Sequence, residues 1–255
     1  MSDLITVQGI VLSAQPVGEY DKRIVLLTRE RGKISAFAKG ARRQNSPFMA
    51  AANPFVFGNF TLFEGRNSYN LNQVTVTHHF VELAARQPGV YYGYYFLELA
   101  DYFGKEGTDE KNMMNLLYLT IKALLDDRLD DRLVRCVFEL RTMLEQGLMP
   151  ELFRCVNCAE ELSERENLYF SLGAHGILCG DCLRKAEISE IRSSKKISPA
   201  ALYTMQFIVG APLNRIYSFT VKEEILWELE HHIHPYVAAN TDRRFKSLQI
   251  LEVMA

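Results

Sequence analysis

The first 80 residues consist of short apolar runs rich in β-branched and aromatic residues, separated by turn-forming groups. Val17-Gly18-Glu19 and Glu30-Arg31-Gly32 are two such turns. The pattern predicts five strands, over Val7–Val17, Arg23–Thr28, Lys33–Lys39, Phe55–Phe63 and Asn70–Thr77. Five strands at this spacing favour a small barrel.

The third run alternates with a period of two, which places its side chains on two different faces of a strand. Small apolar residues stand at positions 34, 36 and 38, and Ser35, Phe37 and Lys39 stand between them. One face therefore suits a core, and the other carries an aromatic ring and a cation. Phe37 could be buried instead of standing on a binding face.

From about residue 80 the apolar period becomes helical. Three stretches show it: Tyr92, Tyr95, Phe96, Leu99 and Phe103; Leu116, Leu117, Leu124 and Leu125; and Leu133, Val137, Leu140 and Leu144. Ser198-Pro199 is typical of an N-cap followed by proline at the first helical position, and it predicts a helix over Ala200–Val209. A last helix is predicted over Val221–His234. Strands followed by a helical bundle give an α+β fold class.

Charge is distributed unevenly along the chain. The 255 residues carry a net charge of -2. Residues 1–80 hold nine basic and five acidic groups, a balance of +4, whereas residues 81–182 hold ten and eighteen, a balance of -8. A basic first segment beside an acidic middle indicates that one part of the protein meets a polyanion.

Nothing near the N-terminus has the basic and apolar regions of a secretory signal, and no window has the roughly 20 apolar residues that span a bilayer. We expect a cytoplasmic protein that does not enter the membrane. The five cysteines are then expected to be reduced rather than paired in disulfides.

Four cysteines form two matched pairs, Cys155-Val156-Asn157-Cys158 and Cys179-Gly180-Asp181-Cys182. Two thiolates on each of two tight turns can complete a tetrahedral Zn²⁺ shell, so Cys155, Cys158, Cys179 and Cys182 are predicted to bind one zinc ion. Four thiolates leave no position for substrate, which makes the metal structural. Reduced core thiols or redox-active pairs are the alternatives. The fifth cysteine, Cys136, lies on an apolar helical stripe and is predicted to be core.

The second chemical signal is a basic segment that runs from Arg29 through Lys33 to Lys39-Gly40-Ala41-Arg42-Arg43. Cations beside glycine can approach phosphates closely, although a basic loop is often only a solvated one. The candidate DNA-binding residues are Lys22, Arg23, Arg31, Lys33, Lys39, Arg42, Arg43 and Arg66. OB-type barrels commonly bind oligonucleotides, which strengthens this interpretation.

Three histidines, His231, His232 and His234, lie close together near the predicted end of the last helix. Their spacing is not the four-residue repeat of a helical metal site, so an exposed helix terminus is expected there. Sequence signatures of an enzyme are missing: the chain has no Gly-x-x-x-x-Gly-Lys loop and no Gly-x-Ser-x-Gly turn. We therefore expect a protein without catalytic residues.

The order of these parts resembles the RecO family of recombination mediators along nearly the whole chain. The resemblance is carried by Glu19-Tyr20-Asp21-Lys22-Arg23, Ala38-Lys39-Gly40-Ala41-Arg42-Arg43, Phe138-Glu139-Leu140-Arg141, the paired cysteine turns and Arg243-Arg244-Phe245-Lys246. It implies an OB-fold domain over residues 1–80, a helical domain over residues 81–150 and 185–255, and an inserted four-cysteine zinc finger over residues 151–184.

The same resemblance implies a function. Family members bind single- and double-stranded DNA, anneal complementary strands, and act with the RecR protein and single-stranded DNA-binding protein to help load RecA. It places the DNA contacts on Lys33, Lys39, Arg42 and Arg43, and it implies association with the nucleoid during repair. Two rival interpretations remain: a zinc-ribbon and OB factor of transcription or translation, and an enzyme with an unrecognised site in the helical domain.

Overall fold

The computed structural model describes residues 4–65, 68–162, 167–187, 191 and 194–254. The chain divides into two compact units, one formed by Met1–Leu125 with Phe245–Ala255 and the other by Asp126–Arg244. The barrel belongs to the first unit and the cysteine pairs to the second. The three domain ranges inferred from the sequence stay a prediction.

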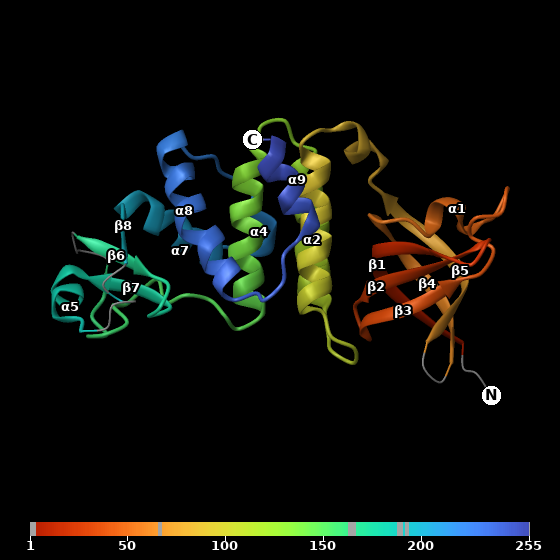
Figure 1. Ribbon diagram of the computed structural model, residues 1–255, viewed down its shortest axis with the longest axis horizontal. Helices are drawn as coiled ribbons and strands as arrows, with labels where there is room; N and C mark the ends of the chain where they lie inside the picture. Colours follow the sequence, from red (N-terminus) through yellow and green to blue (C-terminus); the bar gives the residue numbers. More distant parts are fainter. Residues whose placement is uncertain (1–3, 66–67, 163–166, 188–190, 192–193, 255) are drawn as a thin grey trace. The chain divides into compact units, whose positions relative to one another are not determined.

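The first unit begins with a closed five-stranded barrel in the order β1-β2-β3-β5-β4 (Figure 1). Its strands are β1 (Leu4–Val17), β2 (Asp21–Thr28), β3 (Gly32–Ala38), β4 (Val56–Glu64) and β5 (Tyr69–His79). Neighbouring strands are antiparallel except β3 and β5, whose parallel pairing closes the barrel at Ala36 and Tyr69. The predicted α+β fold with an N-terminal five-stranded barrel is confirmed.

The barrel core is apolar and continuous. It contains Val7, Val11, Ile24, Leu26, Ile34, Ala36, Ala38, Ala41, Ala52, Val56, Phe60, Leu62, Tyr69 and Leu71. Burial alternates strictly along β3, so the predicted apolar face points inwards. Phe37 is half-buried on the opposite face, and Lys39 begins the turn after the strand.

Helices complete the first unit. They are α1 (Phe48–Ala51), the 3-10 turn η1 (Val81–Ala85), α2 (Gly89–Phe103), α3 (Lys111–Leu124) and α9 (Lys246–Met254). Helix α2 packs against α3 and α9, and the ring of Tyr95 lies 5.4 Å from that of Phe245. Leu99, Leu116 and Leu117 are buried, as their helical spacing predicts.

The second unit is built on three long helices, α4 (Asp131–Glu145), α7 (Pro199–Gly210) and α8 (Glu223–Ala239). Both other helices pack against α4. Asp130 caps α4 by accepting a hydrogen bond from the Arg132 N–H, and Ser198 caps α7 by accepting one from the Ala201 N–H. The short turn η2 (Leu213–Arg215) joins α7 to α8. The predicted N-cap at Ser198 is confirmed.

Helix α8 continues five residues beyond the predicted end, through Pro235 to Ala239. The expectation of an exposed helix terminus at the histidines is therefore wrong. His232 is 3% exposed, and Nδ1 of His234 lies 2.6 Å from a carboxylate oxygen of the buried Glu139. Tertiary burial of the turn that follows offsets the hydrogen bond that proline cannot make.

A three-stranded sheet in the order β7-β6-β8 holds the cysteine region. Its elements are β6 (Leu168–Ser171), β7 (Gly176–Cys179), α5 (Gly180–Lys185) and β8 (Lys195–Ile197). Lys195 and Lys196 are exposed on β8. Among the described residues, no helix combines the length and apolar composition that a membrane crossing requires.

Candidate nucleic-acid interface and metal centre

The turn after β3, here named the cationic turn (residues 39–43), is fastened to the first residue of β2 and to the residue before it. The Gly40 N–H donates to Oδ1 of Asp21 at 2.7 Å, and the Arg42 N–H donates to the Tyr20 carbonyl at 2.8 Å. Ala41 is fully buried in the barrel core. The cationic turn is thus a fixed part of the barrel rather than a free loop.

Glycine is needed at position 40 because its φ is +68°, in the left-handed region. This conformation lets the chain reverse between Lys39 and Arg42 while the small Ala41 side chain enters the core. The Arg43 N–H closes the turn by donating to the Gly40 carbonyl at 3.0 Å.

Three cations project from this turn. Lys39, Arg42 and Arg43 are all exposed. The guanidinium of Arg42 donates to the Gly18 carbonyl at 3.3 Å, and that of Arg43 lies 5.1 Å from the Tyr20 ring centre. Guanidinium groups held in this way keep most of their donors available for phosphate oxygens.

Lys22 and Arg23 lie at the same end of the β2–β3 pair, because the register pairs Lys22 with Ala38 and Arg23 with Phe37. The Lys22 ammonium donates to Oδ1 of Asn53 at 2.6 Å. Burial, reinforced by the nearby Arg42 charge, lowers the pKa of Lys22. Nε of Arg23 donates to the Ser35 hydroxyl at 2.8 Å. Both residues extend the surface of the cationic turn.

Arg31 and Lys33 lie at the opposite end of β2 and β3, about 20 Å away at the usual rise per residue. Both are paired with acids: Arg31 with Glu64 at 3.5 Å and Lys33 with Asp101 at 3.6 Å. The eight predicted cations therefore do not form one cluster. The prediction for Arg66 lies outside the described residues.

Sequence reasoning gave no role to the residues that hold the site, namely Asp21, Tyr20 and Asn53. A polar residue beside glycine-containing turns is a weak local signal. Asp21 and Gly40 are 19 positions apart, and Lys22 and Asn53 are 31 apart, so only the barrel register brings them together.

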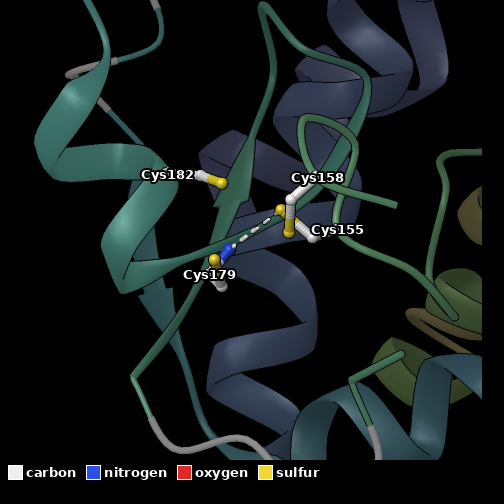
Figure 2. A group of neighbouring side chains, drawn as sticks. All are labelled: Cys155, Cys158, Cys179 and Cys182. Atoms are coloured by element: carbon white, nitrogen blue, oxygen red, sulfur yellow. Dashed lines mark hydrogen bonds between the residues drawn. The ribbon is translucent and has the colours of Figure 1, made fainter. Parts of the chain in front are cut away.

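The four paired cysteines lie close together around the end of β7 (Figure 2). Cys155 and Cys158 come from one turn, Cys179 ends β7 and Cys182 lies in α5. Their four Sγ atoms all lie within 4.8 Å of one another. In the part of the chain that the structure describes, they are the one such grouping of three or more metal-ligating side chains.

This arrangement fits a tetrahedral metal ion. A Zn–S distance of about 2.3 Å places sulfurs about 3.8 Å apart, within the observed limit. Although burial raises the pKa of Cys155, hydrogen bonds from the backbone of Cys158, Cys179 and Asn157 lower it to about 6. Cys155 therefore favours the thiolate, which is the form that binds metal. Burial and hydrogen bonds to the neighbouring thiols raise the pKa of Cys158 to about 12, so in the metal-free cluster the four thiols do not all ionise together.

Two further residues of metal-ligating type, Cys136 and His175, stay outside the cluster. Cys136 is fully buried in α4, as predicted for a core residue, and burial raises the pKa of its thiol. His175 is exposed.

Comparisons with known proteins cover nearly the whole chain. The family model for the recombination protein O N terminal matches residues 1–80, and that for the recombination protein O C terminal matches residues 89–249. A protein of Alkaliphilus metalliredigens (strain QYMF) named DNA repair protein RecO is 30% identical over 248 residues, covering 97% of this chain and 98% of that protein. The protein of the same name from Symbiobacterium thermophilum is 30% identical over 252 residues, covering 98% of each chain. The protein of this name from Clostridium acetobutylicum is 26% identical over 247 residues, covering 97% of this chain and 96% of that protein. With both of its parts matched in order, the chain belongs to the recombination protein O family.

Proposed function

We propose that this chain is a DNA repair protein that binds single- and double-stranded DNA and anneals complementary strands without catalysing a covalent step. The observation that carries the proposal is the cationic turn, where Lys39, Arg42 and Arg43 are exposed on a backbone fixed by Asp21. Family membership supports it, because the relatives are named DNA repair proteins.

The mechanism follows from electrostatics. Two complementary strands repel each other through their phosphates, and cations that neutralise those phosphates lower the repulsion while the base edges stay free to pair. Lys39, Arg42 and Arg43 supply the first contacts. Lys22 and Arg23 extend the path at the same end of the barrel, and Arg31, Lys33 and Arg66 are proposed as further contacts.

The proposed setting is recombinational repair. Acting with RecR and with single-stranded DNA-binding protein, the chain would help RecA load onto coated strands, and it would work in the cytoplasm at the nucleoid. The support for these partners is membership of the family.

We assign Zn²⁺ as the ion that Cys155, Cys158, Cys179 and Cys182 hold, since four thiolate donors suit it. When bound, zinc would supply a structural cross-link between the turn at 155–158, β7 and α5. The four cysteines would fill a tetrahedral shell, so no metal position would be left open for a substrate.

Salt dependence tests the DNA contacts. Double charge reversal, Arg42→Glu with Arg43→Glu, should weaken binding by a similar factor on unrelated sequences. It should also flatten the dependence of log affinity on log salt by about 1.4 for single strands, at about 0.7 per phosphate contact. Arg128→Glu, at a side chain 87% exposed in the second unit, is the control for one charge reversal, and each single variant of Arg42 and Arg43 is compared with it. An unchanged salt slope in the double variant contradicts the proposed contacts.

Annealing tests the function itself. Two complementary oligonucleotides, one coated with single-stranded DNA-binding protein, are mixed with and without the protein in the absence of nucleotide triphosphate. Acceleration supports the proposal. Binding that is selective for sequence or for RNA, without acceleration, favours instead a zinc-ribbon and OB factor of transcription or translation.

A further inference from the structure

A small pocket opens beside the barrel within the first unit. Its volume is about 250 Å³, below the roughly 300–1,000 Å³ of pockets that hold drug-sized ligands. Its lining includes Asn53, Phe55, His79, Phe80, Val81 and Tyr94. Aromatic rings, one amide and one imidazole therefore face a space that suits a single planar ring system.

The aromatic wall is held rigidly. Phe55 has a φ of +67°, a left-handed conformation that bulky residues rarely adopt. Its ring packs on helix α2 where Gly93 leaves room: a Cβ at Gly93 would lie 3.1 Å from the Phe55 ring and 2.8 Å from Leu83. The ring of Tyr94 stands edge-on to Phe55 at 4.9 Å. Backbone strain of this kind tends to cluster at functional sites.

Lys22 connects the pocket to the strand that anchors the cationic turn. The Lys22 ammonium bonds to Oδ1 of Asn53 at 2.6 Å and to the Ala52 carbonyl at 3.3 Å, while its neighbour Asp21 holds Gly40. One lysine side chain therefore spans the distance from the strand that anchors the cationic turn to the rim of the pocket.

We propose that this pocket receives one unstacked nucleobase of a bound single strand, while the neighbouring phosphates lie on the cationic turn. The inference rests on the proposed function, because it assumes that the strand follows Lys39, Arg42 and Arg43. Aromatic side chains stack bases of any sequence. The pocket thus holds the strand by a contact that does not depend on salt.

The polar rim favours a base over an apolar side chain of a protein partner. The Asn53 amide uses one donor on the Met49 carbonyl and one acceptor site on Lys22. One N–H and one lone pair of the amide are left, and such a pair can meet the donor and acceptor edge of a base. No carboxylate is among the lining residues, so nothing in the wall repels a phosphate.

The test compares two single strands of equal length, one with ordinary bases and one with every base removed. Both carry the same phosphates, so the ratio of their affinities isolates base contacts. Tyr94→Ala removes the exposed ring, and Ala84→Trp fills the pocket from an exposed lining position. We expect each variant to lower the ratio of the affinity for the ordinary strand to that for the abasic strand on the order of tenfold, because stacking contributes about 1–3 kcal/mol per base. The slope of log affinity against log salt should stay unchanged. Tyr203→Ala, at a tyrosine 69% exposed in α7, should match the original protein.

The outcomes separate this inference from the proposed function. If the original protein binds neither strand, the proposed function fails. If the original protein binds both strands, and the two pocket variants have the same ratio of affinities for the ordinary and the abasic strand as the original protein, the pocket does not hold a base. The inference is then overturned. The inference is likewise overturned if Ala84→Trp abolishes capture of single-stranded DNA-binding protein while the base ratio stays unchanged, because the occupant is then a protein side chain. Photocrosslinking of a 5-iodouracil strand to the peptide that contains Tyr94 provides positive support.

Discussion

Replacing Asp21 with alanine separates two explanations of DNA binding. Asp21 is an acid beside three exposed cations, so its removal makes the surface more positive, and charge counting alone predicts tighter binding to DNA. The structure gives the opposite expectation, because the carboxylate accepts the Gly40 N–H and fastens the cationic turn. We predict that Asp21→Ala binds DNA more weakly.

The magnitude follows from the two opposing effects. A hydrogen bond to a charged acceptor stabilises by about 1.5–3 kcal/mol, and at 2 kcal/mol its loss shifts the equilibrium between closed and open turns about 30-fold towards the open form. Removing one negative charge roughly 8 Å from a phosphate strengthens attraction by about 0.5 kcal/mol in water, or about twofold. Because the bond from Arg42 to Tyr20 and the burial of Ala41 still favour the closed turn, we expect a net loss in affinity of roughly tenfold.

Asp21→Asn provides the matched control. It removes the same charge but keeps a carbonyl oxygen that can accept from Gly40. We expect it to bind DNA as tightly as the original protein or about twofold more tightly. Fluorescence anisotropy with a labelled single strand at several salt concentrations measures both variants, and thermal unfolding checks that the barrel is intact.

The reasoning is refuted if Asp21→Ala and Asp21→Asn both bind DNA more tightly and to the same degree. In that case the acid would act only through its charge, and the cationic turn would need no fastening. A loss of affinity in the alanine variant alone supports the positioning role.

Three further predictions concern the second unit. Metal analysis should find one zinc per chain in the original protein and none in Cys179→Ser. The variant should also unfold at a lower temperature, as the original protein should when a strong chelator is added. Arg141→Leu should lower the free energy of unfolding by about 3 kcal/mol or more, because the guanidinium donates to the carbonyls of Ile208, Val209 and Ala211. Chemical denaturation measures this loss. The exposed control Arg128→Gln should leave the denaturant concentration at the unfolding midpoint unchanged. Burial lowers the pKa of His232 to about 4. Below pH 6.5 the unfolded chain therefore takes up a proton at this residue that the folded chain does not. As the pH drops towards 4, the free energy of unfolding should fall by up to roughly 3 kcal/mol. His232→Gln should remove that slope and His231→Gln should keep it; equal slopes in both variants would contradict the assignment.

The strands of the barrel could be predicted from sequence because each is a short apolar run bounded by turns. The predicted Arg23–Thr28 and the observed Asp21–Thr28 differ by two residues, and β3 differs by one at each end. The parallel pairing of β3 with β5 has no signal in either strand. The metal cluster could be predicted equally well, since two pairs of cysteines at this spacing already specify the geometry that a metal needs.

The end of helix α8 and the pairing of cations with distant acids could not be predicted from the sequence, because both depend on tertiary contacts. A proline normally ends a helix, but Tyr236 and Val237 are buried after Pro235, and their burial maintains α8 to Ala239. Charge patterns likewise cannot show which cations are already paired, as Lys33 is with Asp101, 68 positions away.

The burial of Ala41 ties the appearance of the proposed DNA affinity to the order in which the barrel folds. The barrel closes only when β1 pairs with β4 and β3 pairs with β5, and both pairings join segments distant in sequence. Such pairings form late, because the loops between them must close first. On the ribosome, a chain that ends before β5 already contains all three cations of the turn but lacks the closed core that seats Ala41. We therefore expect nascent chains to acquire DNA affinity with the fifth strand, long after the arginines themselves have been synthesised.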